Sequence, residues 1–342
     1  MAENPINVAV VGAGAFGRNH ARVYRRLEQA GDPVHLAAVA DQDAARAAAL
    51  ARESGSEVAA FSNIGELITR GGIQAASVAV PTVDHARVAG ELMAAGMDVL
   101  IEKPLASTLA DADELITLAQ RHARIAQVGH LERFNPAVQA TLRLVTRPMF
   151  FEAHRLSVFS PRSLDIDVVL DLMIHDLDIV LTLANSPVSE VRAVGLPVLS
   201  RQVDIANVRL EFQSGCVANL TASRVSTEKV RKLRFFQPRQ YVSIDYSRQD
   251  VLVFTVAANA GASGTAVPGA PGSPIQVAKP EIQTREPLEA ELRAFVEAVR
   301  RRSRPVVPLE DGRRALALAL EIQTAMRAHS QRANLDVLGA GN

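Results

Sequence analysis

Two short patterns in this chain of 342 residues carry side chains that can move a proton. The first is Glu102-Lys103-Pro104, which directly follows the apolar run Asp98–Ile101. A lysine near a bound cation has a lowered pKa and can shuttle protons, although the same tripeptide also suits a surface lysine before a helix-starting proline. The second is Asp171-x-x-x-His175, in which the aspartate can hold the imidazole and stabilise its charged form. Both patterns favour acid–base chemistry.

The second pattern lies in a very apolar segment, 168–183, that is typical of a helix. Four polar residues in and beside it are spaced by four, four and three positions: Asp167, Asp171, His175 and Asp178. They therefore share one face of the helix. Because an unpaired buried carboxylate is costly, the presence of these polar residues on so apolar a helix requires an explanation. A solvated face and a structural Asp–His pair are alternatives. A zinc site is a third, but no second histidine has ligand spacing, so we expect no metal.

Three glycines stand where a strand-like run, Ile6–Val11, changes into a helix pattern, in the order Gly12-Ala13-Gly14-Ala15-Phe16-Gly17. Gly12 permits a tight turn, Gly14 lets the backbone approach a pyrophosphate, and Gly17 lets the helix pack on the strand. The N–H groups of the new helix, which begins around Ala15 and Phe16, would face the anion. The alternative is an α/β turn that binds no nucleotide.

The following strand-like run, Val34–Ala40, ends in Asp41. A carboxylate there accepts hydrogen bonds from the adenine ribose 2′-OH and repels a 2′-phosphate, so we expect a dinucleotide site for NAD rather than NADP. In open α/β sheets the ligand lies at the carboxyl ends of the strands. Residues that follow other strands are therefore further candidates for contact with the cofactor: Pro81, Thr82, His85, Glu102 and Lys103.

The first third of the chain alternates strand and helix patterns, which predicts a parallel sheet covered by helices on both faces. The expected strands are Ile6–Val11, Val34–Ala40, Ala75–Val80, Asp98–Ile101 and Ile125–Val128. The expected helices are Arg18–Ala30, Asp43–Glu53, Ile64–Arg70, Asp84–Ala95 and Leu109–His122. We expect a doubly wound Rossmann domain at residues 1–128.

After Gly129 the pattern predicts an α+β domain, at residues 129–342, with an open, mostly antiparallel sheet. Successive strand patterns follow one another without helices: Glu190–Pro197, Ala206–Phe212, Cys216–Arg224, Lys232–Phe236 and Tyr241–Tyr246. A strand at Phe150–Leu156 and helices at Pro136–Val145 and Val168–Leu183 precede them, and helices at Leu288–Arg301 and Glu310–Ala328 close the chain. Ala257–Pro274 reads as a flexible loop. This domain would bind substrate and form oligomers, with a C-terminal helix able to pack back on the first domain.

Cations in the second half could bind a phosphorylated substrate, because arginine pairs well with phosphate oxygens. Arg133 and Asn135 lie where two domains would close on a substrate, although a helix-cap cluster is an alternative. Further candidates are Arg155, Arg162 and a basic group on a predicted strand, Lys229, Arg231, Lys232 and Arg234. The alternative for the basic group is a solvated face.

The composition excludes several classes of protein. The 37 basic and 37 acidic residues balance, so no overall field favours nucleic acid. No stretch approaches the roughly 20 apolar residues of a membrane span, and the first strand pattern leaves no room for a signal peptide. The single cysteine, Cys216, excludes an internal disulfide and reads as a core residue. We expect a soluble cytoplasmic protein.

These motifs together resemble the glucose–fructose oxidoreductase/inositol dehydrogenase/rhizopine-catabolism (Gfo/Idh/MocA) family over nearly the whole chain. The matching residues are Gly12-x-Gly14-x-x-Gly17, Asp41, Pro81-Thr82 with His85, Glu102-Lys103-Pro104, Arg133-Phe134-Asn135-Pro136 and Asp171-x-x-x-His175. The resemblance implies an NAD-dependent sugar dehydrogenase with Lys103, Asp171 and His175 as its catalytic set. His175 or Lys103 would take the hydroxyl proton while hydride passes to the nicotinamide, and the choice of base stays open.

Three segments are similar to a narrower branch, the UDP-N-acetylglucosamine 3-dehydrogenases: 129–136, Phe235–Pro238 with Tyr241–Ser243, and Glu286–Leu288. This similarity implies oxidation of UDP-N-acetylglucosamine to a 3-keto sugar for a pyridoxal-phosphate aminotransferase in lipid A biosynthesis, by a homodimer or homotetramer. One alternative is a dehydrogenase of a simple sugar or inositol. Another is a nucleotide-sensing regulator on the same fold, which would have no need of Lys103, Asp171 and His175 together.

Overall fold

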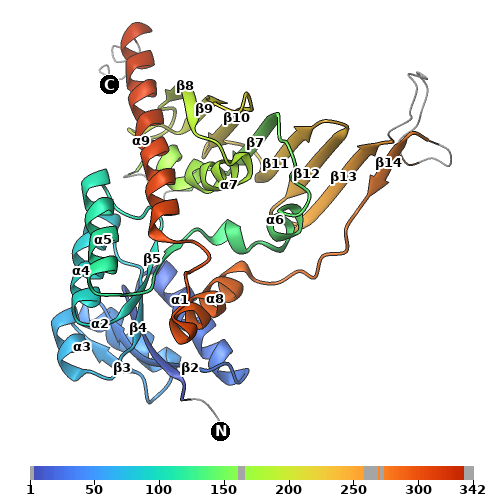
Figure 1. Cartoon of the computed structure of the whole chain (residues 1–342). Helices are drawn as coiled ribbons and strands as arrows, with labels where there is room; N and C mark the ends of the chain where they lie inside the picture. Colours follow the sequence, from blue (N-terminus) through green and yellow to red (C-terminus); the bar gives the residue numbers. More distant parts are fainter. Residues whose placement is uncertain (1–3, 161–165, 258–268, 270–272, 335–342) are drawn as a thin grey trace. The chain divides into compact units, whose positions relative to one another are not determined.

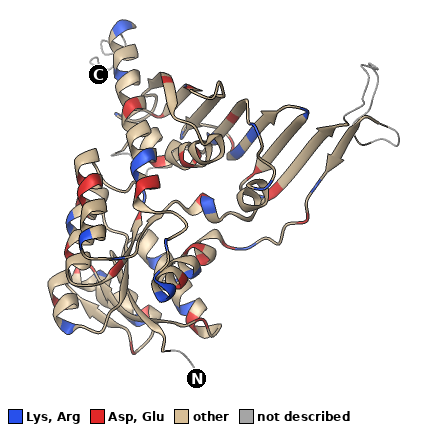
Figure 2. Cartoon of the chain, in the orientation of Figure 1, with Lys and Arg blue, Asp and Glu red and all other residues tan. Residues whose placement is uncertain are grey.

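The computed structural model describes residues 4–160, 166–257, 269 and 273–334, and the chain divides into two compact units. The first unit comprises Met1–Phe134 and Arg285–Leu316, and the second comprises Asn135–Thr284 and Ala317–Asn342. Basic and acidic residues are interspersed along both units (Figure 2). None of the described helices combines the length and apolar character that a membrane span requires.

The first unit is built on a parallel sheet with the strand order β3-β2-β1-β4-β5-β6, which is the Rossmann order (Figure 1). Its strands are β1 (Ile6–Val11), β2 (Val34–Ala40), β3 (Ala59–Phe61), β4 (Ala75–Val78), β5 (Asp98–Glu102) and β6 (Ala126–Gly129). Its helices are α1 (Ala15–Gln29), α2 (Ala44–Ser54), α3 (Ile64–Arg70), α4 (His85–Ala94), α5 (Leu109–Arg121), the 3₁₀ turns η1 (Thr82–Asp84) and η2 (Leu131–Phe134), and α8 (Pro287–Arg301). The expected doubly wound sheet is confirmed.

The two compact units differ from a division after residue 128, because the first unit runs to Phe134 and also takes in Arg285–Leu316, which includes α8. This helix has one apolar face, and Leu292, Phe295 and Val299 of that face are buried in a core with Tyr24 and Leu27 of α1. A stripe of this kind must be buried somewhere, but the sequence does not say against which partner. The last helix, α9 (Leu309–Arg332), has residues in both units.

The second unit is built on an eight-stranded sheet with the order β14-β13-β12-β11-β7-β10-β9-β8. Its strands are β7 (Phe150–Leu156), β8 (Val188–Leu196), β9 (Ile205–Phe212), β10 (Val217–Ser223), β11 (Val230–Gln237), β12 (Gln240–Asp245), β13 (Asp250–Val256) and β14 (Ile275–Ala278). Of its neighbouring pairs only β7 and β10 run parallel, so the expected mostly antiparallel sheet is confirmed. β13 and β14 were not predicted, and most of the expected loop 257–274 lies outside the described residues.

The helical elements of the second unit are α6 (Pro136–Thr141), the π-helical turn η3 (Val169–Met173) and α7 (Ile174–Ala184).

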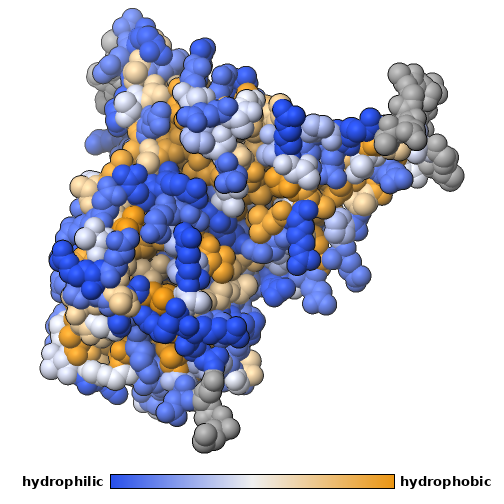
Figure 3. Space-filling model, in the orientation of Figure 1, coloured by the Kyte–Doolittle hydropathy of each residue, from blue (hydrophilic) through white to orange (hydrophobic). Residues whose placement is uncertain are grey.

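The two faces of the eight-stranded sheet differ in burial. Along β7 the side chains alternate, with Phe151, Ala153 and Arg155 buried and the intervening ones partly exposed. The partly exposed face carries a row of aromatic rings, Phe150, Phe236, Tyr241 and Phe254, with successive centroids 5.6, 4.8 and 5.3 Å apart. Figure 3 shows hydrophobic residues at the surface in the region of β12 and β13.

Candidate active site

The three glycines after β1 have different steric environments. Gly12 has a φ of +101°, and a Cβ there would lie 2.4 Å from the carbonyl oxygen of Ala79. A Cβ on Gly17 would lie 1.7 Å from the carbonyl oxygen of Gly12, so only glycine allows α1 to approach the strand. A Cβ on Gly14 would meet nothing within 4 Å. The space above Gly14 is therefore open to a ligand, as a pyrophosphate-binding turn requires.

The start of α1 is also suited to an anion. Gly14 is the N-cap residue, and no side chain of the described residues caps it. Ala15 and Phe16 in the first turn are exposed, the latter by 57%. The unsatisfied N–H groups and the positive end of the helix dipole attract a negative charge at this point. The turn therefore fits the phosphates of a dinucleotide.

Asp41 follows β2 and contacts the glycine-rich turn. Its Oδ2 accepts the N–H of Ala13 at 2.7 Å, its Oδ1 accepts the N–H of Asp43 at 2.8 Å, and Arg46 forms an ion pair with it at 3.2 Å. The carboxylate thus holds the turn in place from the carboxyl end of the neighbouring strand. A role in binding the ribose, which the sequence predicts, would come in addition to this structural one.

Lys103 follows β5 and is joined to Pro104 by a cis peptide bond. Its N–H donates to Oε2 of Glu102 at 3.3 Å, and Oε1 of Glu102 lies 2.8 Å from Nε2 of His20. Burial disfavours the Glu102 anion, but His20 and the Lys103 charge outweigh this effect and keep the pKa of the Glu102 carboxyl below its usual value. A buried carboxylate therefore contacts the main chain of the candidate lysine.

Three further residues that the sequence predicts at the cofactor follow β4. Pro81 is exposed and Thr82 is half-buried at the start of η1. His85 is buried, and its Nδ1 and Nε2 lie 2.9 Å from the carbonyl oxygen of Pro104 and 3.0 Å from that of Val80. Burial lowers the pKa of this imidazole. His85 joins the ends of two strand segments, which favours a supporting role over direct contact with the cofactor.

Asp171 and His175 belong to the second unit and are both half-buried. Asp171 lies in the π-helical turn η3 and His175 in the first turn of α7, so the predicted helix is present but its start is not a regular α-helix. Asp167, the first residue of the predicted stripe, caps this turn by accepting the N–H groups of Val169 and Leu170 at 2.8 and 3.1 Å. π-turns are rare in proteins overall, but those that occur are often at functional sites.

Arg155, a predicted phosphate ligand, is 2% exposed on β7. Its Nε and Nη2 donate to the two carboxylate oxygens of Asp176 at 2.7 and 2.9 Å, and its guanidinium lies 5.1 Å from the centre of the Tyr246 ring. A guanidinium committed to a buried bidentate pair anchors α7 to the sheet. This placement favours a structural role over the expected substrate contact.

The other predicted substrate residues are distributed over both units. Arg133 pairs with Asp311 at 3.0 Å in the first unit. Asn135 is 2% exposed, caps α6 by accepting the Ala137 N–H at 3.0 Å and donates to the Tyr246 carbonyl, which favours the helix-cap alternative. Arg162 lies outside the described residues.

The basic group on β11 is divided between the two faces of the sheet. Arg234 lies on the partly exposed face, where it pairs with Glu152 at 2.9 Å. Arg231 is opposite Arg155 in the register and therefore lies on the same face as Arg155. Lys229 precedes the strand and is exposed. Arg231 therefore lies on the face of the sheet that α7 covers, whereas Arg234 lies on the opposite face.

Both halves of the chain match known sequence families. The family described as "Oxidoreductase family, NAD-binding Rossmann fold" matches residues 6–130, and the "GFO/IDH/MocA C-terminal domain" matches residues 148–240. The UDP-N-acetylglucosamine 3-dehydrogenase of Acidithiobacillus ferrooxidans is 37% identical over 328 residues, which cover 96% of this chain and 99% of that one. The chain belongs to the Gfo/Idh/MocA family. It is an NAD-dependent oxidoreductase that acts on CH–OH groups.

Further known proteins are similar to the chain over part or nearly all of its length. The myo-inositol dehydrogenase Hyg17 of Streptomyces leeuwenhoekii is 36% identical over 56% of this chain and 59% of its own. The solved structure of the Acidithiobacillus enzyme has a TM-score of 0.84 at 34% identity, covering 95% of this chain and 99% of that one. An oxidoreductase from Agrobacterium radiobacter, solved with NAD⁺, L-tartaric acid and magnesium, shares the fold at 16% identity and a TM-score of 0.80, over 95% and 97% of the two chains.

One of the buried acids that the sequence analysis did not identify in this Gfo/Idh/MocA protein lacks a hydrogen-bond partner among the described residues. Glu291 of α8 is fully buried, and its carboxyl oxygens have no hydrogen-bond partner among the described residues. Burial and the nearby charge of Glu102 raise the pKa of Glu291 well above its usual value, which favours the neutral carboxyl group. The signal in the sequence was a glutamate next to Leu292 within the apolar stripe of an amphipathic helix.

Metal binding finds no support in the described part of the chain. No group of three or more His, Cys, Asp or Glu side chains there is arranged to hold a metal ion. The residues of the first unit instead suit an organic cofactor: an open turn above Gly14, an uncapped helix start, and Asp41 and Lys103 at the carboxyl ends of two parallel strands. These features fit NAD, the cofactor of the family.

Proposed function

We propose that this oxidoreductase converts the C3 hydroxyl of UDP-N-acetylglucosamine to a ketone and produces NADH. The observation that carries the proposal is the 37% identity over 96% of the chain to a relative named UDP-N-acetylglucosamine 3-dehydrogenase. The match includes both units, and so covers the cofactor turn as well as the segment with Asp171 and His175.

Proton transfer from the hydroxyl falls to Lys103 and His175. When bound, NAD supplies the hydride acceptor. One of the two side chains accepts the proton, and the other donates a hydrogen bond to the oxygen as it becomes a carbonyl. Asp171, in the turn before His175, orients the imidazole and stabilises its charged form. The half-buried state of Asp171 and His175 supports this assignment, because it leaves both groups partly accessible.

The diphosphate of the substrate would require cations. Arg231 is the candidate that we favour in the described part of the second unit, because its register opposite Arg155 places it on the strand face covered by α7, the helix that carries His175. Arg133 and Arg162 remain candidates from the sequence. Each good arginine–phosphate contact contributes about 1.5–3 kcal/mol. Replacing the arginine that binds the diphosphate should therefore raise KM about 10- to 100-fold with a smaller effect on kcat.

The product suggests where the reaction belongs. A 3-keto sugar is a substrate for a pyridoxal-phosphate aminotransferase, since a ketone condenses with an amine, and the 3-amino sugar would serve lipid A biosynthesis. Both steps would take place in the cytoplasm. A homodimer or homotetramer would use the partly exposed sheet face, because the row of rings from Phe150 to Phe254 is apolar surface that a partner subunit can cover.

The test is the absorbance at 340 nm after the protein is mixed with NAD and UDP-N-acetylglucosamine, free N-acetylglucosamine or myo-inositol. We expect NADH only with the nucleotide sugar. Reduction of the product with borodeuteride should then introduce deuterium at C3. Equal oxidation of the free sugar or inositol would favour a simple polyol dehydrogenase. NADH formation with none of the three would favour the regulator.

A further inference from the structure

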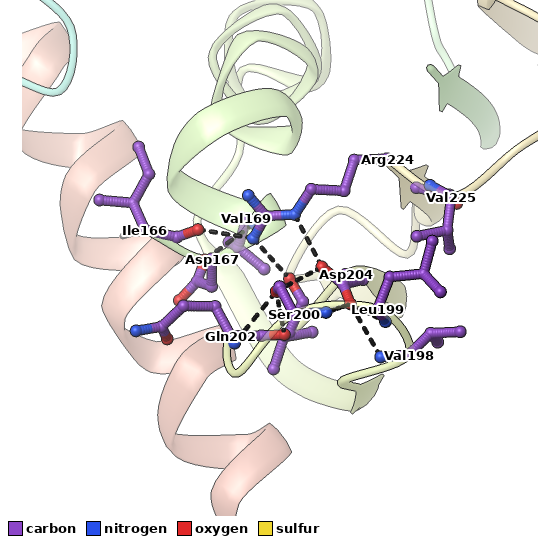
Figure 4. A network of polar contacts seen from close by, with 12 residues as sticks. Ile166, Asp167, Val169, Val198, Leu199, Ser200, Gln202, Asp204, Arg224 and Val225 are labelled. Atoms are coloured by element: carbon purple, nitrogen blue, oxygen red, sulfur yellow. Dashed lines mark hydrogen bonds and ion pairs between the residues drawn. The ribbon is translucent and has the colours of Figure 1, made fainter. Parts of the chain in front are cut away.

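Asp204 and Arg224 form a buried ion pair where β9 begins and β10 ends (Figure 4). Asp204 is 0% and Arg224 4% exposed, and Nε of the arginine lies 3.0 Å from Oδ1 of the aspartate. The main chains are also joined, because the N–H of Arg224 donates to the carbonyl of Asp204 at 2.9 Å. The strand ends of the second unit therefore hold the two charges in a defined place.

The Asp204 carboxylate is saturated with donors. Its Oδ2 accepts the N–H groups of Val198, Leu199 and Ser200 at 2.8, 2.7 and 2.8 Å, and its Oδ1 accepts the Ser200 hydroxyl at 2.6 Å. Burial disfavours the anion, but these hydrogen bonds outweigh that cost and lower the pKa of Asp204 to about 2. The aspartate is therefore a fixed negative charge that orients the guanidinium of Arg224.

Arg224 uses its other side to bind main-chain carbonyls near the start of η3. Its Nη2 donates to the carbonyl of Ile166 at 2.6 Å and to that of Val203 at 3.1 Å. The N–H of Val168 donates to the same Val203 carbonyl at 3.0 Å. Residues 166–168 are thus attached to the β9 end of the sheet at two points.

The attached segment leads directly into the π-turn. Asp167 lies between the two attached residues, and its Oδ1 caps the N–H groups of Val169 and Leu170, while Gln323 donates to its Oδ2. A shift of one residue in the start of a helix rotates its side chains by about 100°. The position of residues 166–168 therefore affects the direction in which Asp171 and His175 leave the turn.

We propose that the Asp204–Arg224 pair is a positioning device for Asp171 and His175, acting through the main chain at Ile166 and Val203. The proposal rests on the proposed function, in which these two residues take part in proton transfer. Arginine suits the task because one planar guanidinium reaches a carboxylate and two carbonyls at once, whereas lysine is a single point charge. Neither Asp204 nor Arg224 is itself a catalytic residue.

The test is the Arg224→Lys variant, which keeps the charge and loses the forked geometry. We expect kcat with UDP-N-acetylglucosamine to fall about 10- to 100-fold, since a misplacement of about 1 Å can cost on the order of 10² in rate. The KM and the Kd for NAD should stay within about 3-fold, and the pH profile of kcat should shift. Amides 168–173 should exchange hydrogen faster, whereas those of β12 and β13 should not.

The matched control is Arg302→Lys in the first unit. The Arg302 side chain is more exposed than that of Arg224, but it likewise joins a buried carboxylate, that of Asp98, to a main-chain carbonyl, that of Ala123 at 2.7 Å. We expect this variant to lower the thermal midpoint without a loss of kcat. Equal losses of kcat in both variants would show a general effect of stability and would overturn the proposal.

A milder variant covers the case in which Arg224→Lys does not fold. Ser200→Ala removes one donor to Asp204 and keeps both charges. It should accelerate exchange at amides 168–173 and lower kcat less than the arginine variant would. If the wild type does not oxidise UDP-N-acetylglucosamine, the exchange measurement still tests the positioning role. Unchanged exchange at 168–173 in the tested variant would overturn that role without bearing on the substrate.

Discussion

His20 and Glu102 are 82 positions apart in the chain, yet Nε2 of the histidine lies 2.8 Å from Oε1 of the glutamate. His20 belongs to α1, whose start follows the glycine-rich turn, and Glu102 ends β5 next to Lys103. The same carboxylate accepts the N–H of Lys103 through its other oxygen. One buried contact therefore joins the helix that would bind the phosphates to the candidate proton-transfer residue.

Lys103→Ala should separate proton transfer from cofactor binding. We expect kcat to fall by on the order of 10²–10⁴, the usual range for a positioned proton-transfer group. The Kd for NAD, measured by fluorescence titration, should change little, because the Lys103 main-chain contact with Glu102 remains. Near-normal turnover would remove Lys103 from the mechanism.

Asp41→Ala should weaken NAD binding and lessen the preference for NAD over NADP. The variant loses the hydrogen bond to Ala13, and the predicted ribose contact and repulsion of a 2′-phosphate would be lost with it. Asp43→Ala is the control, because Asp43 caps α2 and pairs with Arg46 without bonding to the glycine-rich turn. Isothermal titration with both cofactors measures the effect. An equal loss for NAD and NADP would mean that Asp41 only supports the turn.

Glu291→Gln should stabilise the protein at high pH. The pKa of Glu291 is raised in the folded state, so the folded protein holds a proton that the unfolded chain releases above about pH 4.3. Wild-type stability should therefore decline as the pH rises from that point towards the folded pKa, by at most about 1.4 kcal/mol per pH unit. The neutral amide has no such decline.

Urea denaturation of both proteins between pH 4 and pH 9 tests the effect of Glu291→Gln. The curves should be close at pH 4 and diverge in favour of the variant above it. Glu297→Gln on the same helix is the control, since Glu297 is half-exposed and pairs with Arg300 and Arg301. Parallel pH curves for wild type and Glu291→Gln would mean that Glu291 is ionised in the folded protein.

Arg155→Met should unfold the second unit more easily without weakening substrate binding. It leaves the buried Asp176 carboxylate without its bidentate partner, which costs about 3–5 kcal/mol. Adding Asp176→Leu should recover much of the loss, because an apolar pair needs no charge compensation. Thermal denaturation and KM for UDP-N-acetylglucosamine are the measurements. A large rise in KM with unchanged stability would restore Arg155 as a phosphate ligand.

The sequence predicted the elements that have clear boundaries. β1 and β2 have the expected residues because Gly12 and Asp41 interrupt apolar, β-branched runs. β14 was missed because its four residues are short and mostly exposed, and so have neither periodicity nor length to signal them. A weak pattern explains the missed β14, whereas β13 was missed although its run Asp250–Val256 is rich in the β-branched residues typical of strands.

The sequence identified candidate residues of the site but did not predict which residues they contact. The Asp171–His175 spacing indicated a helix, yet nothing in that spacing distinguishes a π-turn from an α-turn. His20 is hidden in the buried face of an amphipathic helix, and its partner lies on a distant strand. Arg155 carried a charge suited to phosphate, but its pairing with Asp176 depends on the docking of α7 against β7. Tertiary neighbours, which a single sequence does not list, decide each of these cases.

The glycines of the glycine-rich turn are subject to two different evolutionary constraints. Any side chain at position 17 would collide with the backbone 1.7 Å away, so selection for a folded protein alone already requires glycine there. At position 14 a methyl group has room, and only the approach of a ligand can forbid it. A lineage that abandoned catalysis would be free to change Gly14 but would keep Gly17.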